Sequence, residues 1–443
     1  MSWDFETDPA FQKKLDWADQ FMTNEVEPLD FVVDYAWNIH HPVSRKVVPR
    51  LQKIVRDEGL WAAHLGPHLG GTGLGQLNLA LLNEVIGRSP HGPIVFGSQA
   101  PDSGNAEILA RYGTETQKQR YLEPLLAAES VSAFSMTEPA GGSDPTQFTT
   151  KAVRDGSEWV LTGEKWFTSH ANYADFLIVL AVTDPDAAPH ERMSTFVFPV
   201  NTPGVEIVRH VGTFGHSSLQ GAHSYIRYNA VRLPSDALLG KRGRGFEVAQ
   251  TRLGGGRIHH AMRTVAQVKR AFDMMCERAL SRETKGGLLA DKQLVQAMIA
   301  ESWIQWQQFR LLVLRTAWRI DKYNDYSKVR SDIAAVKIMM PKVLHDVASR
   351  ALQIHGSLGV SVEMPFGGMI IESYVNGLAD GPTEVHQLNL ARQLLKGYSG
   401  TDGLFPTGHL PARRQAALEK FADVLAEVEQ EQALKEQPAH APA

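Results

Sequence analysis

Apolar residues recur with a helical period through the first part of the chain. They fall at three- and four-residue spacing over residues 77–86 and again from Glu107 to Tyr112, where Gly113 ends the pattern. We therefore expect an N-terminal α-helical domain over residues 1–130.

From Val131 onward the pattern changes to short β-type runs separated by turn formers such as Asp155-Gly156. The runs cover residues 159–161, 176–180, 195–198, 205–208 and 225–228. No helix-length pattern lies between them, so an antiparallel barrel or sandwich fits better than a parallel sheet with crossover helices. We expect a middle β domain over residues 131–243.

After Gly245 the helical period returns in three long stretches, residues 246–281, 290–324 and 329–355, followed by a shorter one at 384–397. About 35 helical residues span roughly 50 Å, which is the scale of a helix bundle. The pattern predicts a C-terminal four-helix bundle over residues 244–400 and a tail over 401–443 with a charged helix. The fold class is therefore mainly α with a central β domain.

Composition narrows the functional classes. The chain has 443 residues, 43% of them hydrophobic and 21% charged, with a net charge of −4. A net charge this close to zero gives the chain no overall electrostatic attraction to nucleic acid or to an anionic membrane. The chain also lacks a run of ~20 apolar residues that could cross a bilayer, and its first residues do not show a secretory signal pattern. We expect a cytoplasmic protein without a membrane span or a nucleic-acid partner.

Other familiar site patterns are absent from the sequence. His64 and His68 are four residues apart, but Gly66 and Pro67 between them prevent the shared helix face that paired zinc ligands need. The glycines of residues 71–75 have the wrong spacing for a dinucleotide turn and follow no strand. We expect no metal site, and neither a serine hydrolase nor a Rossmann enzyme.

Two segments carry the candidate chemistry. Residues 134–144 read Phe-Ser-Met-Thr-Glu-Pro-Ala-Gly-Gly-Ser-Asp, and residues 163–169 read Gly-Glu-Lys-Trp-Phe-Thr-Ser. A glycine-rich turn with small hydroxyls lets backbone N–H groups approach a ligand closely. By composition alone the first segment could equally be an ordinary interdomain turn.

Together the two segments resemble the signature of the acyl-CoA dehydrogenase family, which reads approximately aromatic-x-x-Thr-Glu-Pro-x-x-Gly-Ser-Asp. The resemblance implies a bound FAD and an acyl-CoA substrate. It also implies that Thr168 bonds near flavin N5 and that Ser143 contacts the flavin phosphates or the CoA moiety. The implied cofactor-binding residues in these segments are Phe134, Met136, Thr137, Gly142, Ser143, Trp166 and Thr168.

The resemblance continues into the predicted bundle. Residues 282–293 are similar to the family's Arg-x-x-Phe-Gly element and its following Gln, and residues 353–357 are similar to its Gln-x-x-Gly-Gly element. In the family these elements bind the FAD of the neighbouring subunit, which implies a homodimer or homotetramer. The implied cofactor-binding residues here are Arg282, Thr284, Gln293, Gln353, Gly356 and Ser357.

The catalytic base is expected at Asp380, which stands where the family usually has Glu before Gly-Thr-Ser-Gln. Some members place the base on the first bundle helix instead, and that position is Gly256 here, which has no carboxylate. Glu384 is an alternative acid, and Asp380 could instead merely cap the next helix. The resemblance further assigns Thr383 and Glu384 to the cofactor, and Arg257, Gly381 and Ser143 to the substrate.

The glycines of residues 254–256 leave two interpretations open: tight packing of the bundle, or room for a bulky or substituted acyl chain. The surrounding residues are similar to the subgroup of human acyl-CoA dehydrogenase members ten and eleven and their bacterial relatives, which implies long-chain, branched or 4-hydroxyacyl thioesters. Electron-transferring flavoprotein is the implied electron acceptor in fatty acid β-oxidation. The alternatives are an oxidase on the same scaffold, such as a nitroalkane or acyl-CoA oxidase, and a non-catalytic flavin-binding scaffold.

Overall fold

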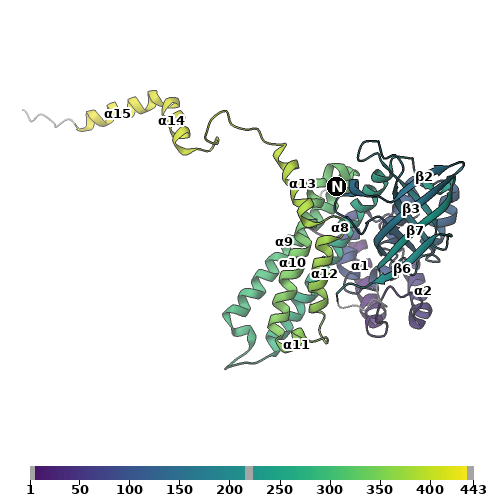
Figure 1. Cartoon of the computed structure of the whole chain (residues 1–443). Helices are drawn as coiled ribbons and strands as arrows, with labels where there is room; N and C mark the ends of the chain where they lie inside the picture. The colour runs from purple at the N-terminus through teal and green to yellow at the C-terminus, as the bar shows by residue number, and fades with distance from the viewer. Residues whose placement is uncertain (1–4, 215–222, 437–443) are drawn as a thin grey trace, which may run out of the picture. The chain divides into compact units, whose positions relative to one another are not determined.

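The computed structural model describes residues 5–214 and 223–436, so the extreme ends of the predicted first domain and of the tail lie outside the described residues. The chain divides into two compact units, residues 1–390 and 391–443. The larger unit holds the N-terminal helices, the β-sheet and the helix bundle (Figure 1).

The N-terminal region is helical, as the period of its apolar residues predicts. The first helix begins after Asp8, whose carboxylate accepts the backbone N–H groups of Ala10 and Phe11 at 2.9 and 3.1 Å. The predicted apolar runs fall in the third and fifth helices. The helices are α1 (Pro9–Phe21), α2 (Pro42–Asp57), α3 (Gly75–Ile86), α4 (Gly92–Val95), α5 (Asp102–Tyr112), α6 (Glu115–Gln117) and α7 (Glu123–Ala127).

Eight strands of the described residues form one sheet, in the order β6-β7-β3-β2-β4-β5-β8, with β1 paired to β4. They are β1 (Ser132–Ser135), β2 (Lys151–Asp155), β3 (Glu158–Ser169), β4 (Phe176–Val182), β5 (Met193–Pro199), β6 (Val205–Val211), β7 (His223–Pro234) and β8 (Leu238–Leu239). Most pairings are antiparallel, but β1 and β2 each pair in parallel with β4, so the sheet is mixed rather than wholly antiparallel. The long connection between β1 and β4 permits the parallel pairing that a hairpin turn forbids.

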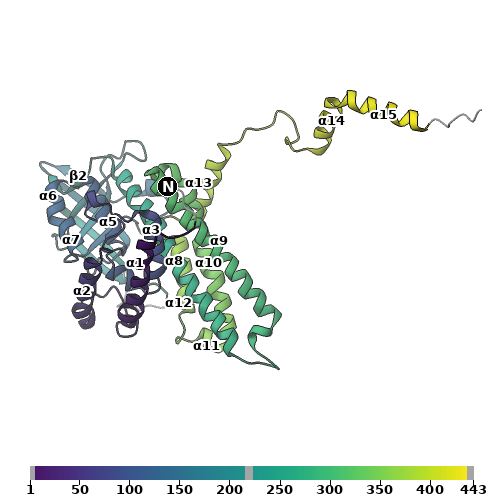
Figure 2. The same cartoon turned by 180° about the vertical axis from the view of Figure 1, so that it is seen from behind.

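Helices of the N-terminal region cover one face of the sheet (Figure 2), and their apolar side chains share a buried cluster with those of β4 and β5. Ile108 and Leu109 of α5 share a buried apolar cluster with Ile178 of β4. Tyr121, just before α7, packs its ring 4.9 Å from that of Phe176. The cluster also includes Val248 and Ala249 near the start of α8 (Gly245–Ser281). The N-terminal helices, the sheet and the start of α8 therefore share one core.

The bundle consists of α8 (Gly245–Ser281), α9 (Gln293–Tyr323), α10 (Arg330–His355), α11 (Ser357–Val360), α12 (Phe366–Leu378) and α13 (Thr383–Leu395). The three long predicted helices correspond to α8, α9 and α10. The fourth bundle helix is α12, which the periodicity missed because Gly367 and Gly368 lower its helix propensity. Packing against α10 stabilises it nonetheless, and Phe366 and Met340 are both fully buried in the shared core. None of the described helices is long and apolar enough to cross a lipid bilayer.

In the smaller unit the predicted charged helix is two helices, α14 (Leu410–Lys420) and α15 (Ala422–Glu436), which meet at Phe421. Apolar side chains of both helices, including Phe421 and Leu425, are exposed in the single chain.

Gly245 seats the start of α8 against the sheet. A Cβ atom built there would lie 2.7 Å from Leu180 Cδ1 and 2.7 Å from the backbone carbon of Ser194. We expect Gly245→Ala to lower the free energy of unfolding by about 1–3 kcal/mol through overpacking, measured by urea denaturation. Gly367→Ala is the matched control, because a Cβ there would meet nothing within 4 Å and should leave stability equal or higher. A Gly245→Ala protein as stable as the control would contradict the close seating of α8.

Candidate active site

Asp380 lies in the turn between α12 and α13, and its backbone is left-handed, with φ of 56°. Aspartate tolerates this conformation better than most residues, and Gly381 follows with φ of 99°. The carbonyl oxygen of Asp380 accepts a hydrogen bond from Arg257 Nε at 2.9 Å, and His386 Nε2 lies 3.3 Å from the same oxygen. Side chains from α8 and α13 therefore hold this turn on both sides.

The Asp380 carboxylate lies directly against the glycine stretch of α8. A Cβ atom built at Gly256 would be 3.1 Å from Asp380 Oδ2, and one built at Gly255 would be 3.0 Å from Glu107 Oε2. Positions 380 and 256, the two places from which the resemblance draws the family's base, thus lie next to each other. In this chain the glycines make room for neighbouring carboxylates, which agrees with the tight-packing interpretation.

Positive charge surrounds this carboxylate. Burial raises the pKa of Asp380, but neighbouring groups outweigh the burial and hold its pKa below the ordinary value: His260, Arg252, Arg257 and Lys337. Burial and the charge of Arg263 lower the pKa of His260 itself to about 4, and the Asp380 carboxylate opposes this shift. Asp380 is therefore ionised at neutral pH although it is half-buried, and an ionised carboxylate is the state that a general base requires.

Each cation is anchored by another element. Lys337, on the buried face of α10, donates to the carbonyl oxygen of Asn376 in the last turn of α12, a group that the helix itself leaves without a partner. Arg252 Nε donates to Asn105 Oδ1 of α5 at 2.9 Å, and its guanidinium lies 4.2 Å from the centre of the Phe134 ring on β1. Arg252 thus connects Asp380, through its charge, with Phe134 of β1, through its packing.

The two motif segments, residues 134–144 and 163–169, meet next to β1. The backbone N–H of Trp166 donates to the carbonyl of Thr137 at 2.8 Å, and the hydroxyls of Thr168 and Ser135 are 3.0 Å apart. Ser135 also lies 2.8 Å from the hydroxyl of Tyr228. Five of the predicted cofactor residues therefore share one end of the sheet: Phe134, Met136, Thr137, Trp166 and Thr168.

A buried ion pair joins the same two segments from behind. Lys165 Nζ lies 3.0 Å from Glu138 Oε1 and donates to the Met136 carbonyl at 2.6 Å. Glu138 also accepts the backbone N–H groups of Thr149 and Thr150 at 2.7 and 2.8 Å. Burial lowers the pKa of Lys165 to about 8, and Glu138 partly offsets this effect. The pair positions the motif and does not face a substrate.

The turn after Thr137 leaves open space around Gly141. Glu138 and Gly141 exchange two backbone hydrogen bonds of 3.1 Å each, and a Cβ atom built at Gly141 would meet nothing within 4 Å. The predicted residues Gly142 and Ser143 are exposed beside it. Open space beside a glycine-rich turn with an exposed small hydroxyl fits the phosphate-bearing part of a flavin nucleotide.

The remaining predicted cofactor residues lie at the far end of α8. Arg282 Nη1 donates to the carbonyl oxygen of His355 at 3.4 Å, next to Gly356, whose φ is 65°. These residues are exposed in the single chain: Arg282, Thr284, Gln293, Gln353, Gly356 and Ser357. Arg282 follows Gly256 by about 26 residues, or roughly 39 Å of helix. Thr383 and the exposed Glu384 lie at the start of α13, beside Asp380.

Sequence reasoning missed two neighbours of Asp380: Arg252 and Lys337. One signal was available for Lys337, which falls on the apolar stripe of its helix between Ile333 and Met340. A lysine at such a position must find a polar partner in the interior.

The chain matches the acyl-CoA dehydrogenase models for the N-terminal, middle and C-terminal domains at residues 10–129, 133–231 and 243–395. A Mycobacterium tuberculosis protein described as probable acyl-CoA dehydrogenase FadE2 is 41% identical over 352 residues, covering 78% of this chain and 85% of the relative. A solved chain from Mycobacterium abscessus described as an acyl-CoA dehydrogenase is 35% identical, with a TM-score of 0.82, covering 89% of this chain and all of that one. The chain therefore belongs to the acyl-CoA dehydrogenase family.

Acyl-CoA dehydrogenase family member 11 of Rattus norvegicus is 39% identical over 398 residues, covering 87% of this chain and 50% of the relative. The chain thus spans about half the length of the first curated relatives it matches. A glutaryl-CoA dehydrogenase from Mycobacterium smegmatis, solved with FADH2, shares the fold at 22% identity and a TM-score of 0.74, covering 89% of this chain and 96% of that one.

The Glu138–Lys165 pair gives a direct test of how the motif is held. Removing one partner leaves an uncompensated buried charge, so we expect Glu138→Gln to cost about 3–5 kcal/mol of stability. The double variant Glu138→Gln/Lys165→Met should be more stable than Glu138→Gln alone, because no unpaired charge remains. Thermal denaturation of the four proteins in this cycle measures the coupling.

The matched control is the exposed pair of Lys53 and Asp57 on α2, 2.7 Å apart. There Asp57→Asn should change stability by at most about 1 kcal/mol. Equal losses at the two pairs would contradict a structural role for Glu138 and Lys165.

Proposed function

We propose that this chain is an FAD-dependent acyl-CoA dehydrogenase that converts an acyl-CoA thioester to the trans-2-enoyl-CoA, with Asp380 removing the α proton. The observation that carries the proposal is the position of the Asp380 carboxylate, which lies against Gly256. Its pKa is lowered in part by Arg252, which also packs on Phe134 of the first motif segment. FAD, when bound, supplies the acceptor for the β hydride.

An α proton of a thioester is too weakly acidic for a carboxylate to remove in water, so the site must stabilise the enolate oxygen that develops. The backbone N–H of Asp380 is the proposed donor to that oxygen. Arg257 holds the Asp380 carbonyl at 2.9 Å and thereby fixes the orientation of the turn. Substrate binding would exclude water and raise the pKa of Asp380 from its low value in the free protein, which would make it a stronger base.

Residues of β1 and β3 suit the flavin-binding half of the proposed site. Trp166 and Thr168 lie on β3, and Phe134 lies on β1 under Arg252. We assign the flavin ring to this edge together with Met136 and Thr137, and the flavin phosphates or the CoA moiety to Gly142 and Ser143. This assignment rests on family membership and on the open space around Gly141.

We propose that the second set of cofactor residues serves the FAD of another subunit. Arg282 lies roughly 39 Å along α8 from Gly256, which supports separate roles for the two ends of the helix. We propose that each FAD contacts the Asp380 end of one chain and the Arg282 end of a second, in a homodimer or homotetramer. Electron-transferring flavoprotein is the proposed electron acceptor, and Arg257 and Gly381 are proposed to border the substrate.

The base is tested by Asp380→Asn, which keeps the size of the side chain but removes its charge. We expect flavin content and acyl-CoA binding to be retained while turnover falls by at least 1,000-fold, roughly the effect of removing general-base catalysis. Turnover is measured by anaerobic flavin reduction with a panel of acyl-CoAs. The matched control is Glu363→Gln, an exposed acid between α11 and α12 with no assigned role in the site, which should keep most of the activity.

Because Gly256 faces the same carboxylate, the double variant Asp380→Gly/Gly256→Glu moves the base onto α8 and should recover part of the activity. Full activity in Asp380→Asn would show that the base lies elsewhere. Rapid peroxide formation on exposure of the reduced protein to air would favour the oxidase alternative.

The shared cofactor site is tested by subunit complementation. Asp380→Asn and Arg282→Ala chains, each carrying a different affinity tag, are co-expressed, and the mixed oligomer is purified through both tags. If each site uses Asp380 of one chain and Arg282 of another, the mixed oligomer contains one intact site, and its activity should far exceed that of either parent. If both residues serve the same site within one chain, the mixed oligomer will stay as inactive as its parents.

A further inference from the structure

His386 is a buried histidine in the first turn of α13, beside the turn that carries Asp380. Its Nε2 lies 3.3 Å from the carbonyl oxygen of Asp380. A carbonyl oxygen can only accept a hydrogen bond, so Nε2 must carry the hydrogen that is donated. This contact therefore fixes His386 in the Nε2–H tautomer, as a donor to the backbone of Asp380.

A second donor reaches the same oxygen from another helix. Arg257 Nε on α8 lies 2.9 Å from it. A carbonyl oxygen has two lone pairs, and these two donors use both. The peptide group between Asp380 and Gly381 is therefore held in two directions, by α8 and by α13.

The backbone of this turn needs such support. Asp380 and Gly381 are both left-handed, with φ of 56° and 99°. For a residue with a Cβ atom this conformation is strained, and it persists only where surrounding contacts determine it. The strain lies at the residue that carries the proposed base, so the contacts that hold this turn decide where the carboxylate points.

His386 also accounts for the glycine at position 381. A Cβ atom built at Gly381 would lie 3.1 Å from His386 Nε2, and 3.8 and 3.9 Å from the ring carbons Cδ2 and Cε1. The imidazole thus occupies the space into which a side chain at position 381 would project. The two residues form a matched pair, in which the missing side chain of one lets the other reach the backbone.

The end of α12 is held by different side chains. Lys337 on α10 donates to the carbonyl oxygen of Asn376, and the Thr383 hydroxyl donates to that of Gly377 at 3.2 Å. These contacts fix the helix before it reaches Asp380. Removing the imidazole should therefore loosen the peptide after Asp380 and leave α12 folded.

His386 is a neutral donor at pH 7. Burial is the largest of the effects that lower its pKa to about 4, and the charges of Arg257 and Lys337 lower it further. The hydrogen bond to the Asp380 carbonyl and the charge of Asp380 oppose this shift only in part. The hydrogen bond from His386 is therefore made by an uncharged imidazole throughout the neutral pH range.

We propose that His386 is a positioning residue for the base, which fixes the peptide after Asp380 and so keeps the carboxylate directed at the α carbon of the thioester. This inference rests on the proposed function. Oδ2 of Asp380 lies 3.1 Å from the Cβ position of Gly256, and rotation of the peptide would move it away. Misplacing a reacting group by about 1 Å can cost about 100-fold in rate.

The role is tested by His386→Ala, which removes the donor, and by His386→Gln, whose side-chain amide can still donate. In His386→Ala we expect kcat and the rate of α-hydrogen exchange in deuterated water to fall by about 10–100-fold. KM for the acyl-CoA and the flavin content should change by at most about threefold, because other residues bind the substrate and the cofactor. His386→Gln should recover most of the lost rate, because it restores a donor to the Asp380 carbonyl.

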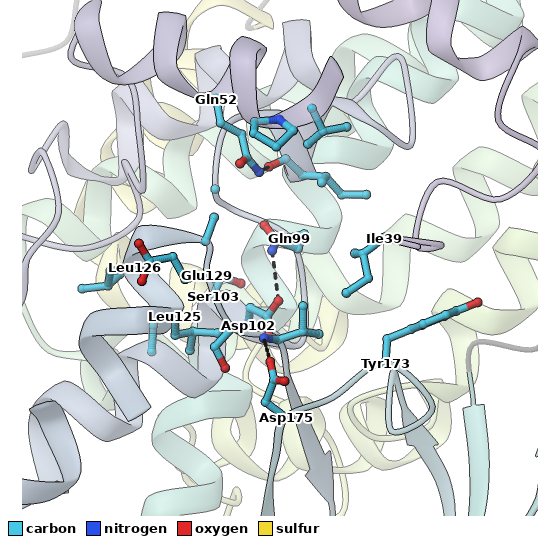
Figure 3. A pocket seen from close by; sticks show the side chains of 18 of the residues that line it. Ile39, Gln52, Gln99, Asp102, Ser103, Leu125, Leu126, Glu129, Tyr173 and Asp175 are labelled. Atoms are coloured by element: carbon cyan, nitrogen blue, oxygen red, sulfur yellow. Dashed lines mark hydrogen bonds between the residues drawn. The ribbon is translucent and has the colours of Figure 1, made fainter. Parts of the chain in front are cut away.

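The matched control is Gln52→Ala. Gln52 on α2 lines a cavity of about 580 Å³ in the N-terminal region (Figure 3). It is 7% exposed, as His386 is, and its Nε2 donates to the carbonyl oxygen of Ile94 at 3.1 Å. Every described residue that lines this cavity precedes β4, so the control removes the same kind of buried hydrogen bond outside the Asp380 turn. We expect Gln52→Ala to lower thermal stability and to exchange α hydrogens at the wild-type rate.

The outcomes separate the positioning role from the proposed function. Wild-type exchange in His386→Ala, with none in Asp380→Asn, would overturn the positioning role and leave the base in place. A loss that His386→Gln fails to recover would also overturn it, because the hydrogen bond would then not be the cause. A loss shared by Gln52→Ala would do the same, since a general loss of stability would explain both. Absence of exchange in the wild-type protein would instead contradict the proposed function itself.

Discussion

The candidate active site depends on keeping one half-buried carboxylate ionised. A lone buried carboxylate would take up a proton, because burial penalises its charged form. At Asp380 this penalty is outweighed by basic groups from two bundle helices, with His260, Arg252 and Arg257 on α8 and Lys337 on α10. The geometry depends on the same contacts, since Arg257 also holds the strained turn and Gly256 leaves the space that the carboxylate fills.

These contacts make the bundle and the sheet interdependent. Arg252 packs on Phe134 of β1 while its charge acts on Asp380, and Gly245 seats α8 on β4 and β5 only seven residues earlier. The buried Glu138–Lys165 ion pair holds the two motif segments to each other. The proposed base and the proposed flavin surface are thus positioned by one continuous set of contacts rather than by two independent domains.

The sequence predicted features that arise locally and missed those that arise from packing. The apolar period located α3, α5 and the three long bundle helices, because each must bury one stripe. It missed α12, where Gly367 and Gly368 weaken local propensity and packing on α10 decides the outcome. The parallel pairing of β1 with β4 leaves no mark in either strand's composition. Family resemblance singled out Asp380 and Gly256 separately, but their contact, and the cations around them, depend on how α8, α10 and α12 pack.

The most direct test of the central claim separates proton removal from hydride transfer. An acyl-CoA is incubated anaerobically with the protein in deuterated water, and NMR follows the loss of the α-hydrogen signal of the recovered thioester. Wild-type protein should exchange the α hydrogens with solvent, and the Asp380→Asn protein, with its cofactor content unchanged, should not. Equal exchange by the two proteins would contradict the assignment of Asp380 as the base.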